Sequence, residues 1–230
     1  TGSYGNDFET KTLDHDRDIE FAIDPMDVDE TNQIVSLANI QSRFEKTQAI
    51  PELDCYTFSK LYTEAKRVGA KISNTAITTA NIEAMEEAGV PLERVIMYCT
   101  PAFKTKLKNA EGIQRTLEVS GGAKNIDRRV RSLDDISTIK TAPASRLKTA
   151  FDFTEGFQVA SAGKQINYIM IDPEAQVSRV KYSYIKAFTP GHDSRTADKY
   201  LYQNRRFNGT FALLDDLLKQ GCIINAEAEG

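Results

Sequence analysis

The alternation of apolar and polar residues near the N-terminus predicts two β-strands. Residues 7–13 and 19–23 place apolar side chains at every second position, which is the period of a strand with one buried face. The polar residues 14–18 between them predict a turn, so the segment 7–23 is expected to form a β-hairpin. Since an isolated two-stranded hairpin is marginally stable in water, we expect this hairpin to dock on a second subunit.

A long helical element is predicted next. Side chains suited to helix capping at 29–32 precede apolar residues that recur at helical spacing as far as Val68. Pro51 lacks an amide hydrogen and should kink this element, and Gly69 should end it. The two helical segments together span roughly 35 residues, or roughly 50 Å at 1.5 Å per residue, which predicts an elongated subunit.

The rest of the chain predicts a mixture of helices and strands. Helices are expected at 79–88, at 102–109 with Pro101 at the helix start, and at 172–182 with Asp172 as the cap and Pro173 at the first position. Strands are expected at 95–99, 136–140, 166–171, 184–188, 199–214 and 222–226. The fold class is therefore α+β.

Composition indicates a soluble globular chain with an uneven charge. Apolar residues make up 40% and charged residues 27%, and no run approaches the roughly 20 apolar residues that a membrane helix needs. The formal net charge is −4, but residues 1–30 carry ten acidic side chains against two basic ones. This acidic segment is either a solvated loop or a surface that contacts basic side chains of another copy.

Candidate catalytic and ligand-binding groups are few. The three cysteines are widely spaced without a C-x-x-C pair, which argues against zinc and against a disulfide framework, and predicts that Cys99 is a buried, inert thiol. The glycine-rich segment 120–124 lacks the spacing of a phosphate-binding loop, which favours a simple turn. His192, Asp193 and Ser194 are consecutive, whereas a catalytic triad is a spatial arrangement, which favours a solvated loop.

The polar segment 14–18 is a further candidate for ligand binding. A cation could be gathered by Asp14, His15, Asp16 and Asp18, but these residues lack the spacing of a calcium loop. The sequence thus predicts no catalytic residue, no cofactor-binding residue, no metal ligand and no cofactor, and the chain is not expected to be an enzyme.

Basic residues concentrate in the segment 103–149, which has eleven basic side chains against five acidic ones. This excess favours contact with acidic surfaces of neighbouring copies and weak, non-specific contact with nucleic-acid phosphates. Arg205 and Arg206 lie beside Tyr202 and Phe207, a combination that suits base stacking, although a strand at a junction between subunits is favoured.

Several short motifs occur in a recognisable order along the chain. The most specific is Gln-x-Ile-Pro-Glu-x-Asp-x-Tyr at 48–56, together with the acidic stretch before it. The others lie at 24–32, 44–48, 95–101, 143–147, 166–173 and 202–207. In this order the sequence resembles the major capsid proteins of tailed double-stranded DNA bacteriophages, which have the Hong Kong 97-type capsid fold.

The resemblance implies both a domain layout and a function. Residues 1–30 would be the E-loop hairpin and its base, 31–74 the peripheral domain with the spine helix, 75–198 the axial domain, and 199–230 the return to the peripheral domain. The chain would assemble into pentamers and hexamers of an icosahedral shell around double-stranded DNA.

Portal and scaffolding proteins would be its further partners, without a membrane, and it would reside in the virion after assembly in the host cytoplasm. Family members carry an N-terminal arm, so a segment before Thr1 is expected. An encapsulin-like nanocompartment shell and a small-molecule α/β enzyme remain the alternatives.

Overall fold

The computed structural model describes residues 10–30, 37–74, 79–109, 136, 138–192 and 197–227. Its internal contacts divide the chain into two compact units. The first comprises Thr1–Ile50 with Ser178–Phe211, and the second Pro51–Val177 with Ala212–Gly230. Each unit therefore brings together segments that lie far apart in the sequence.

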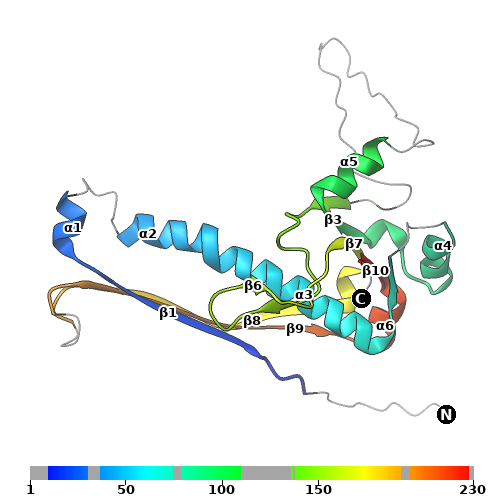
Figure 1. Ribbon diagram of the computed structural model, residues 1–230. Coiled ribbons are helices and arrows are strands. Elements are labelled where there is room, and N and C mark those ends of the chain that lie inside the picture. The colour runs from blue at the N-terminus through cyan, green and yellow to red at the C-terminus, as the bar shows by residue number, and fades with distance from the viewer. Residues whose placement is uncertain are drawn as a thin grey trace, which may run out of the picture. The chain divides into compact units, whose positions relative to one another are not determined.

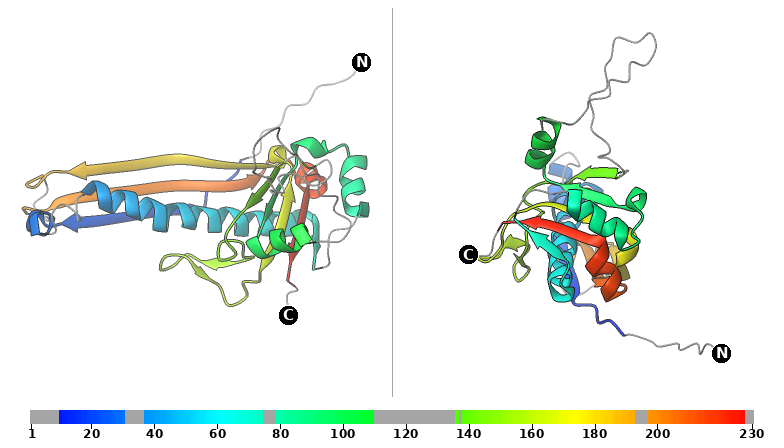
Figure 2. Two further views of the ribbon diagram at one scale, coloured as in Figure 1. Left: turned by 90° about the horizontal axis from the view of Figure 1, so that it is seen from above. Right: turned by 90° about the vertical axis from the view of Figure 1, so that its right-hand side faces the viewer.

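The first unit contains a three-stranded sheet with the order β1-β9-β8 (Figure 1). Its strands are β1 (His15–Ile23), β8 (Gln176–Phe188) and β9 (Tyr200–Ala212). Strands β1 and β9 are antiparallel, with His15 opposite Asn208 and Ile23 opposite Tyr200. Figure 2 shows the three strands side by side along most of their length. Helices α1 (Pro25–Glu30) and α2 (Leu37–Phe44) and the π-helical turn η1 (Glu45–Ala49) belong to the same unit.

The predicted N-terminal hairpin is wrong for the described residues. Residues 15–18, expected to turn, lie inside β1, and residues 10–13 are not part of a strand. The polar run is compatible with a strand because β1 buries only one face: Asp16 and Asp18 are exposed, while His15 is buried. Its hydrogen-bonding partner is β9 of the same chain, so β1 does not depend on a second subunit for pairing.

The long helical element is present from α2 through η1 to α3 (Ile50–Val68). Pro51 has no N–H to donate to the preceding turn, and its ring crowds that turn, which accounts for the π-helical turn just before it. Gly69 ends α3 with a φ of 72°, a conformation that glycine adopts without strain. The amide of Ala70 then donates to the carbonyl of Ala65 at 2.9 Å, which caps the helix.

The second unit is built around a five-stranded mixed sheet with the order β2-β10-β7-β3-β4. These strands are β2 (Lys71–Ser73), β3 (Ile96–Cys99), β4 (Thr138–Thr141), β7 (Ile166–Ile171) and β10 (Cys222–Ala226). Strand β7 is antiparallel to β3 and β10, whereas β3 pairs with β4, and β10 with β2, in parallel.

Both faces of this sheet are buried, which explains its continuously apolar strands. Ile169 and Ile224 pack on one face in a cluster with Leu61 of α3. Met97 and Met170 pack on the other face in a cluster with Met85 of α4 (Thr79–Glu87).

Helix α5 (Pro101–Asn109) begins at a proline as predicted, and helix α6 (Asp215–Gly221) is one that the pattern missed. The short elements η2 (Leu92–Arg94), β5 (Phe151–Asp152) and β6 (Gln158–Val159) complete this unit with the turn η3 (Pro173–Ala175). No helix in the described part of the chain is long and apolar enough to cross a membrane.

The predicted helix at 172–182 is wrong beyond its first turn. Asp172 does cap a turn, since its carboxylate accepts from the amide of Glu174 at 3.1 Å, but only the short η3 follows. The residues after it form β8 instead. Val177 and Val180 are β-branched and favour a strand, and β9 supplies the hydrogen bonds.

Candidate assembly surface

The sheet of the first unit ends in two edge strands, β1 and β8. An edge strand presents a row of backbone N–H and C=O groups that its own sheet does not pair, so it is a template for further contacts. Strand β8 has 13 residues, nine of which are exposed. An edge this long and this open is the feature of the described residues that most resembles an interface.

Strand β8 combines apolar, aromatic and basic side chains. Val180 is 54% exposed and Tyr182 48% exposed, although both are large side chains that normally gain free energy from burial. The rings of Tyr182 and Tyr184 stack with centroids 6.3 Å apart, as expected for residues on the same face of a strand. The ammonium group of Lys186 lies 5.3 Å from the centroid of the Tyr184 ring.

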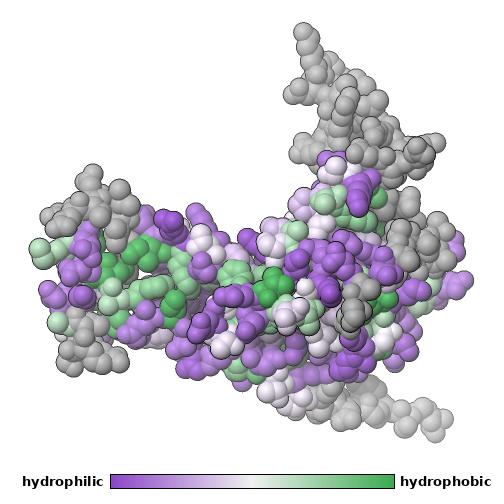
Figure 3. Space-filling model, in the orientation of Figure 1, coloured by the Kyte–Doolittle hydropathy of each residue, from purple (hydrophilic) through white to green (hydrophobic). Residues whose placement is uncertain are grey.

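Strand β1 presents an acidic face. Its exposure alternates, so that Asp16, Asp18 and Glu20 are exposed on one face while His15 and Ile23 are buried on the other. The first unit also has hydrophobic residues at its surface, and Figure 3 shows them gathered at the end of the unit where α1 and α2 lie.

Strand β9 holds two of these carboxylates in place. The guanidinium of Arg205 donates to both carboxylate oxygens of Asp16, at 3.1 and 2.5 Å, and these hydrogen bonds lower the pKa of Asp16. The side-chain amide of Gln203 donates to Glu20 at 3.2 Å. The acidic face is therefore ordered by the chain's own sheet.

The opposite face of β9 anchors the helical turn η1. Arg206 donates to both carboxylate oxygens of Glu45 at 2.6 Å, and the side-chain amide of Asn204 donates to the same carboxylate at 2.9 Å. Phe21 of β1 lies nearby, with its ring 5.4 Å from that of Phe44 and 5.9 Å from that of Tyr202. Arg205 and Arg206, considered above for base stacking, are thus both engaged in ion pairs within the chain.

The four residues considered for cation binding do not converge. Strand geometry places His15 on the buried face of β1 and Asp16 and Asp18 on the exposed one. Burial, with a smaller effect of Arg17, lowers the pKa of His15 to about 4. No group of three potential metal ligands occurs among the residues that the structure describes.

The remaining candidates are inert or lie elsewhere. Cys99 is fully buried, and burial raises the pKa of its thiol. Burial also raises the pKa of Cys55 and of Cys222, in each case to about 12. The ring of His192 stacks on that of Phe188 at 4.4 Å. The glycine-rich segment 120–124, Asp193, Ser194 and much of the basic segment 103–149 lie outside the described residues.

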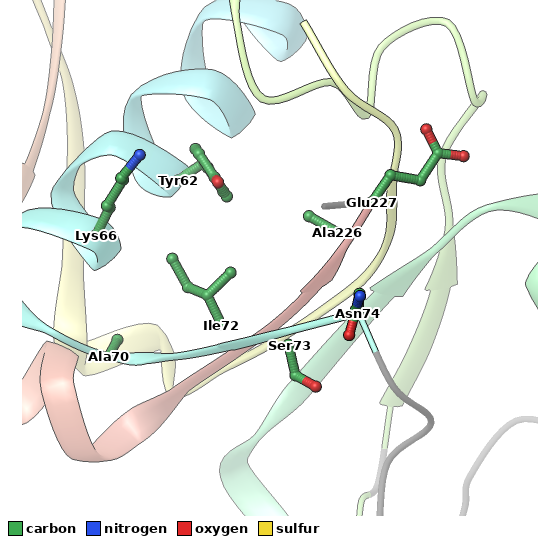
Figure 4. A pocket seen from close by; sticks show the side chains of 8 residues that line it. All are labelled: Tyr62, Lys66, Ala70, Ile72, Ser73, Asn74, Ala226 and Glu227. Atoms are coloured by element: carbon green, nitrogen blue, oxygen red, sulfur yellow. The ribbon is translucent and has the colours of Figure 1, made fainter. Parts of the chain in front are cut away.

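One pocket lies in the second unit, between the end of α3 and strands β2 and β10 (Figure 4). It is lined by Tyr62, Lys66, Ala70, Ile72, Ser73, Asn74, Ala226 and Glu227. Lys66 and Glu227 are its two charged residues, and the Glu227 carboxylate points away from the cavity in Figure 4.

Comparisons with known proteins give the fold. No protein-family model matches the sequence, and no curated protein matches it significantly. In structure, a chain from Mycobacterium phage Che8 aligns over 92% of this chain and 70% of its own length, with a TM-score of 0.59 and 11% identity.

Two further similar structures are described as capsids. The mature capsid of bacteriophage PhiM1 aligns over 98% of this chain and 77% of its own, with a TM-score of 0.53 and 14% identity. The capsid of cyanophage P-SCSP1u aligns over 100% and 80%, with a TM-score of 0.51 and 13% identity. The chain thus has the fold of a phage major capsid protein, and the predicted α+β capsid fold is confirmed.

Proposed function

We propose that this chain is the structural subunit of an icosahedral phage capsid, which assembles as pentamers and hexamers around double-stranded DNA. The observation that supports this function best is structural similarity to phage capsids over essentially the whole chain. A long edge strand with exposed apolar side chains is consistent with it, because such a strand is stabilised by contact with another molecule. The function is therefore mechanical: many copies make the same contacts and enclose a volume.

The same proposal assigns regions of the chain. Residues 31–74 would form the peripheral domain with its spine helix, residues 75–198 the axial domain, and residues 199–230 the return to the peripheral domain. Residues 1–30 would supply the base of the E-loop. Since β1 pairs with β9, the part of this segment within β1 belongs to the same sheet as the returning segment.

Partners and location follow from the capsid function. Copies of the chain itself would be the main partner, with portal and scaffolding proteins and non-specifically bound DNA as further ones. The protein would reside in the virion after assembly in the host cytoplasm.

We also infer that the chain is not an enzyme. Two solved structures that are similar to it are phage capsids, and the thiols of the described residues are buried, where a thiol is inert.

Electron microscopy of the purified chain tests this function directly. We expect closed particles with five-fold and six-fold clusters of subunits, and a nucleic-acid signal in particles isolated from infected cells. A chain that sediments as a monomer under all ionic conditions would contradict the proposal. Closed particles filled with a protein cargo would instead identify a nanocompartment shell.

A further inference from the structure

The two edge strands of the first unit carry charges of opposite sign. Strand β8 contains Arg179, Lys181 and Lys186 and no carboxylate, whereas the exposed face of β1 contains Asp16, Asp18 and Glu20. Since Arg205 already pairs with Asp16, the negative charge that this face offers to a second molecule is carried by Asp18 and Glu20. Among the described residues, no carboxylate forms an ion pair with Arg179 or Lys181. One sheet thus presents an acidic surface at one edge and an unneutralised basic surface at the other.

We propose that the open edge of β8 of one copy pairs with the open edge of β1 of a second copy of this chain, so that the basic face of β8 lies beside the acidic face of β1. This inference rests on the proposed function and identifies the surfaces that join neighbouring subunits. Attraction between Lys181 and Asp18 across the contact aligns the two copies. Val180 and Tyr182 are about half exposed in the single chain and lie on the face of β8 opposite Lys181, so pairing at the strand edge partly covers them from that side.

Charge also disfavours the symmetric alternatives. Two β8 strands brought together would oppose Arg179 and Lys181 to the same residues of the partner, and two β1 strands would oppose carboxylates. Like charges at an interface select against such pairings. The favoured contact therefore joins two different surfaces, which is the heterologous type.

A heterologous contact is the type from which rings are built. Each copy uses β8 toward one neighbour and β1 toward the other, so every copy in a ring makes the same two contacts. A contact of like surfaces would instead stop at a dimer. The charge pattern of this one sheet thus favours the geometry that pentamers and hexamers require.

Engineered cysteines provide the most direct test, because Cys55, Cys99 and Cys222 are all buried and leave the surface free of native thiols. Chains carrying D18C and chains carrying K181C are mixed under assembly conditions and mildly oxidised. We expect a disulfide-linked dimer to form about tenfold faster than in the control. The control mixes D18C with K219C, since Lys219 is an exposed residue of α6 in the other unit.

Charge reversal gives an independent readout. We expect R179E combined with K181E to lower the assembly yield about tenfold at low salt, and D18K combined with E20K to do the same. All four changes in one chain should restore the yield to within about twofold of the unchanged chain. If D18K with E20K impairs folding, as judged by circular dichroism, D18N with E20Q replaces it and should abolish the salt dependence of assembly.

The outcomes separate this inference from the proposed function. If the unchanged chain assembles but D18C and K181C link no faster than the control, and the quadruple variant shows no rescue, the contact between β8 and β1 is overturned while the capsid function stands. If the unchanged chain never assembles, the capsid function fails, and this contact fails with it.

Discussion

At the scale of single residues, the buried His15 makes the stability of the β1–β9 pairing depend on pH. Its side chain is 5% exposed, and burial lowers its pKa from 6.5 to about 4. Between these two values the unfolded chain binds a proton that the folded chain does not bind. The free energy of unfolding should therefore fall as the pH drops from 6.5 toward 4, by up to about 3 kcal/mol, and level off below.

The measurement is urea unfolding at several pH values, compared between the unchanged chain and H15Q. The variant cannot take up the proton, so its free energy of unfolding should depend less steeply on pH in this window. H192Q is the matched control, because His192 is exposed and follows the end of β8. Equal slopes in H15Q and H192Q would show that His15 does not cause the dependence.

The buried cysteines support a second prediction at this scale. A thiol reacts as its thiolate, and burial raises the pKa of Cys55 and Cys222 to about 12. At neutral pH a thiol reagent should therefore leave the native chain unlabelled and label all three cysteines in denaturant. Rapid labelling of the native chain at any one cysteine would contradict the burial of that residue.

At the scale of elements, the Glu45–Arg206 ion pair links the π-helical turn η1 to β9. The two side chains are 20% and 22% exposed, so the pair is partly shielded from water. Replacing Glu45 with Ala leaves Arg206 and Asn204 without their shared acceptor and should destabilise the chain by about 2 kcal/mol in urea unfolding. D16A is the comparison: its pair with Arg205 is more exposed, so its loss should be clearly smaller.

Short sequence patterns correctly predict those helices and strands that are determined by residues close by in the sequence. Gly69 ended a helix, Pro101 began one, and the run 166–171 formed a strand, as expected. The errors fall on β1 and the first half of β8, where the deciding partner is β9. His15 pairs with Asn208, and a contact over so long a stretch of chain leaves no trace in the local pattern of either segment.

The candidate surface was only partly predictable for the same reason. The sequence predicts the acidic charge of residues 1–30, and the intersubunit junction that it favours at Arg205 and Arg206 stays a prediction. The order of strands in the sheet places Asp16 against Arg205 and makes β8 the exposed basic edge. The capping residues Asp172 and Pro173 favour a helix over the first half of β8, although the alternation of basic and apolar side chains at 179–182 has the period of a strand.

At the scale of the whole molecule, hydrogen exchange should distinguish the two sheets. Strands β7 and β10 are buried on both faces, so their amides should exchange slowly in the single chain. Every second amide of β8 points away from β9 toward the open edge, and these amides should exchange fast.

Assembly should change the exchange of one sheet and not the other. If β8 docks on a second copy, its solvent-facing amides gain protection in assembled particles, while β7 and β10 keep the protection that they already have. Mass spectrometry of peptides covering 176–188 and 166–171, before and after assembly, measures both. Because slow exchange of β8 in the unassembled chain would mean that its edge is already covered, that result would remove the physical reason for an intersubunit contact there.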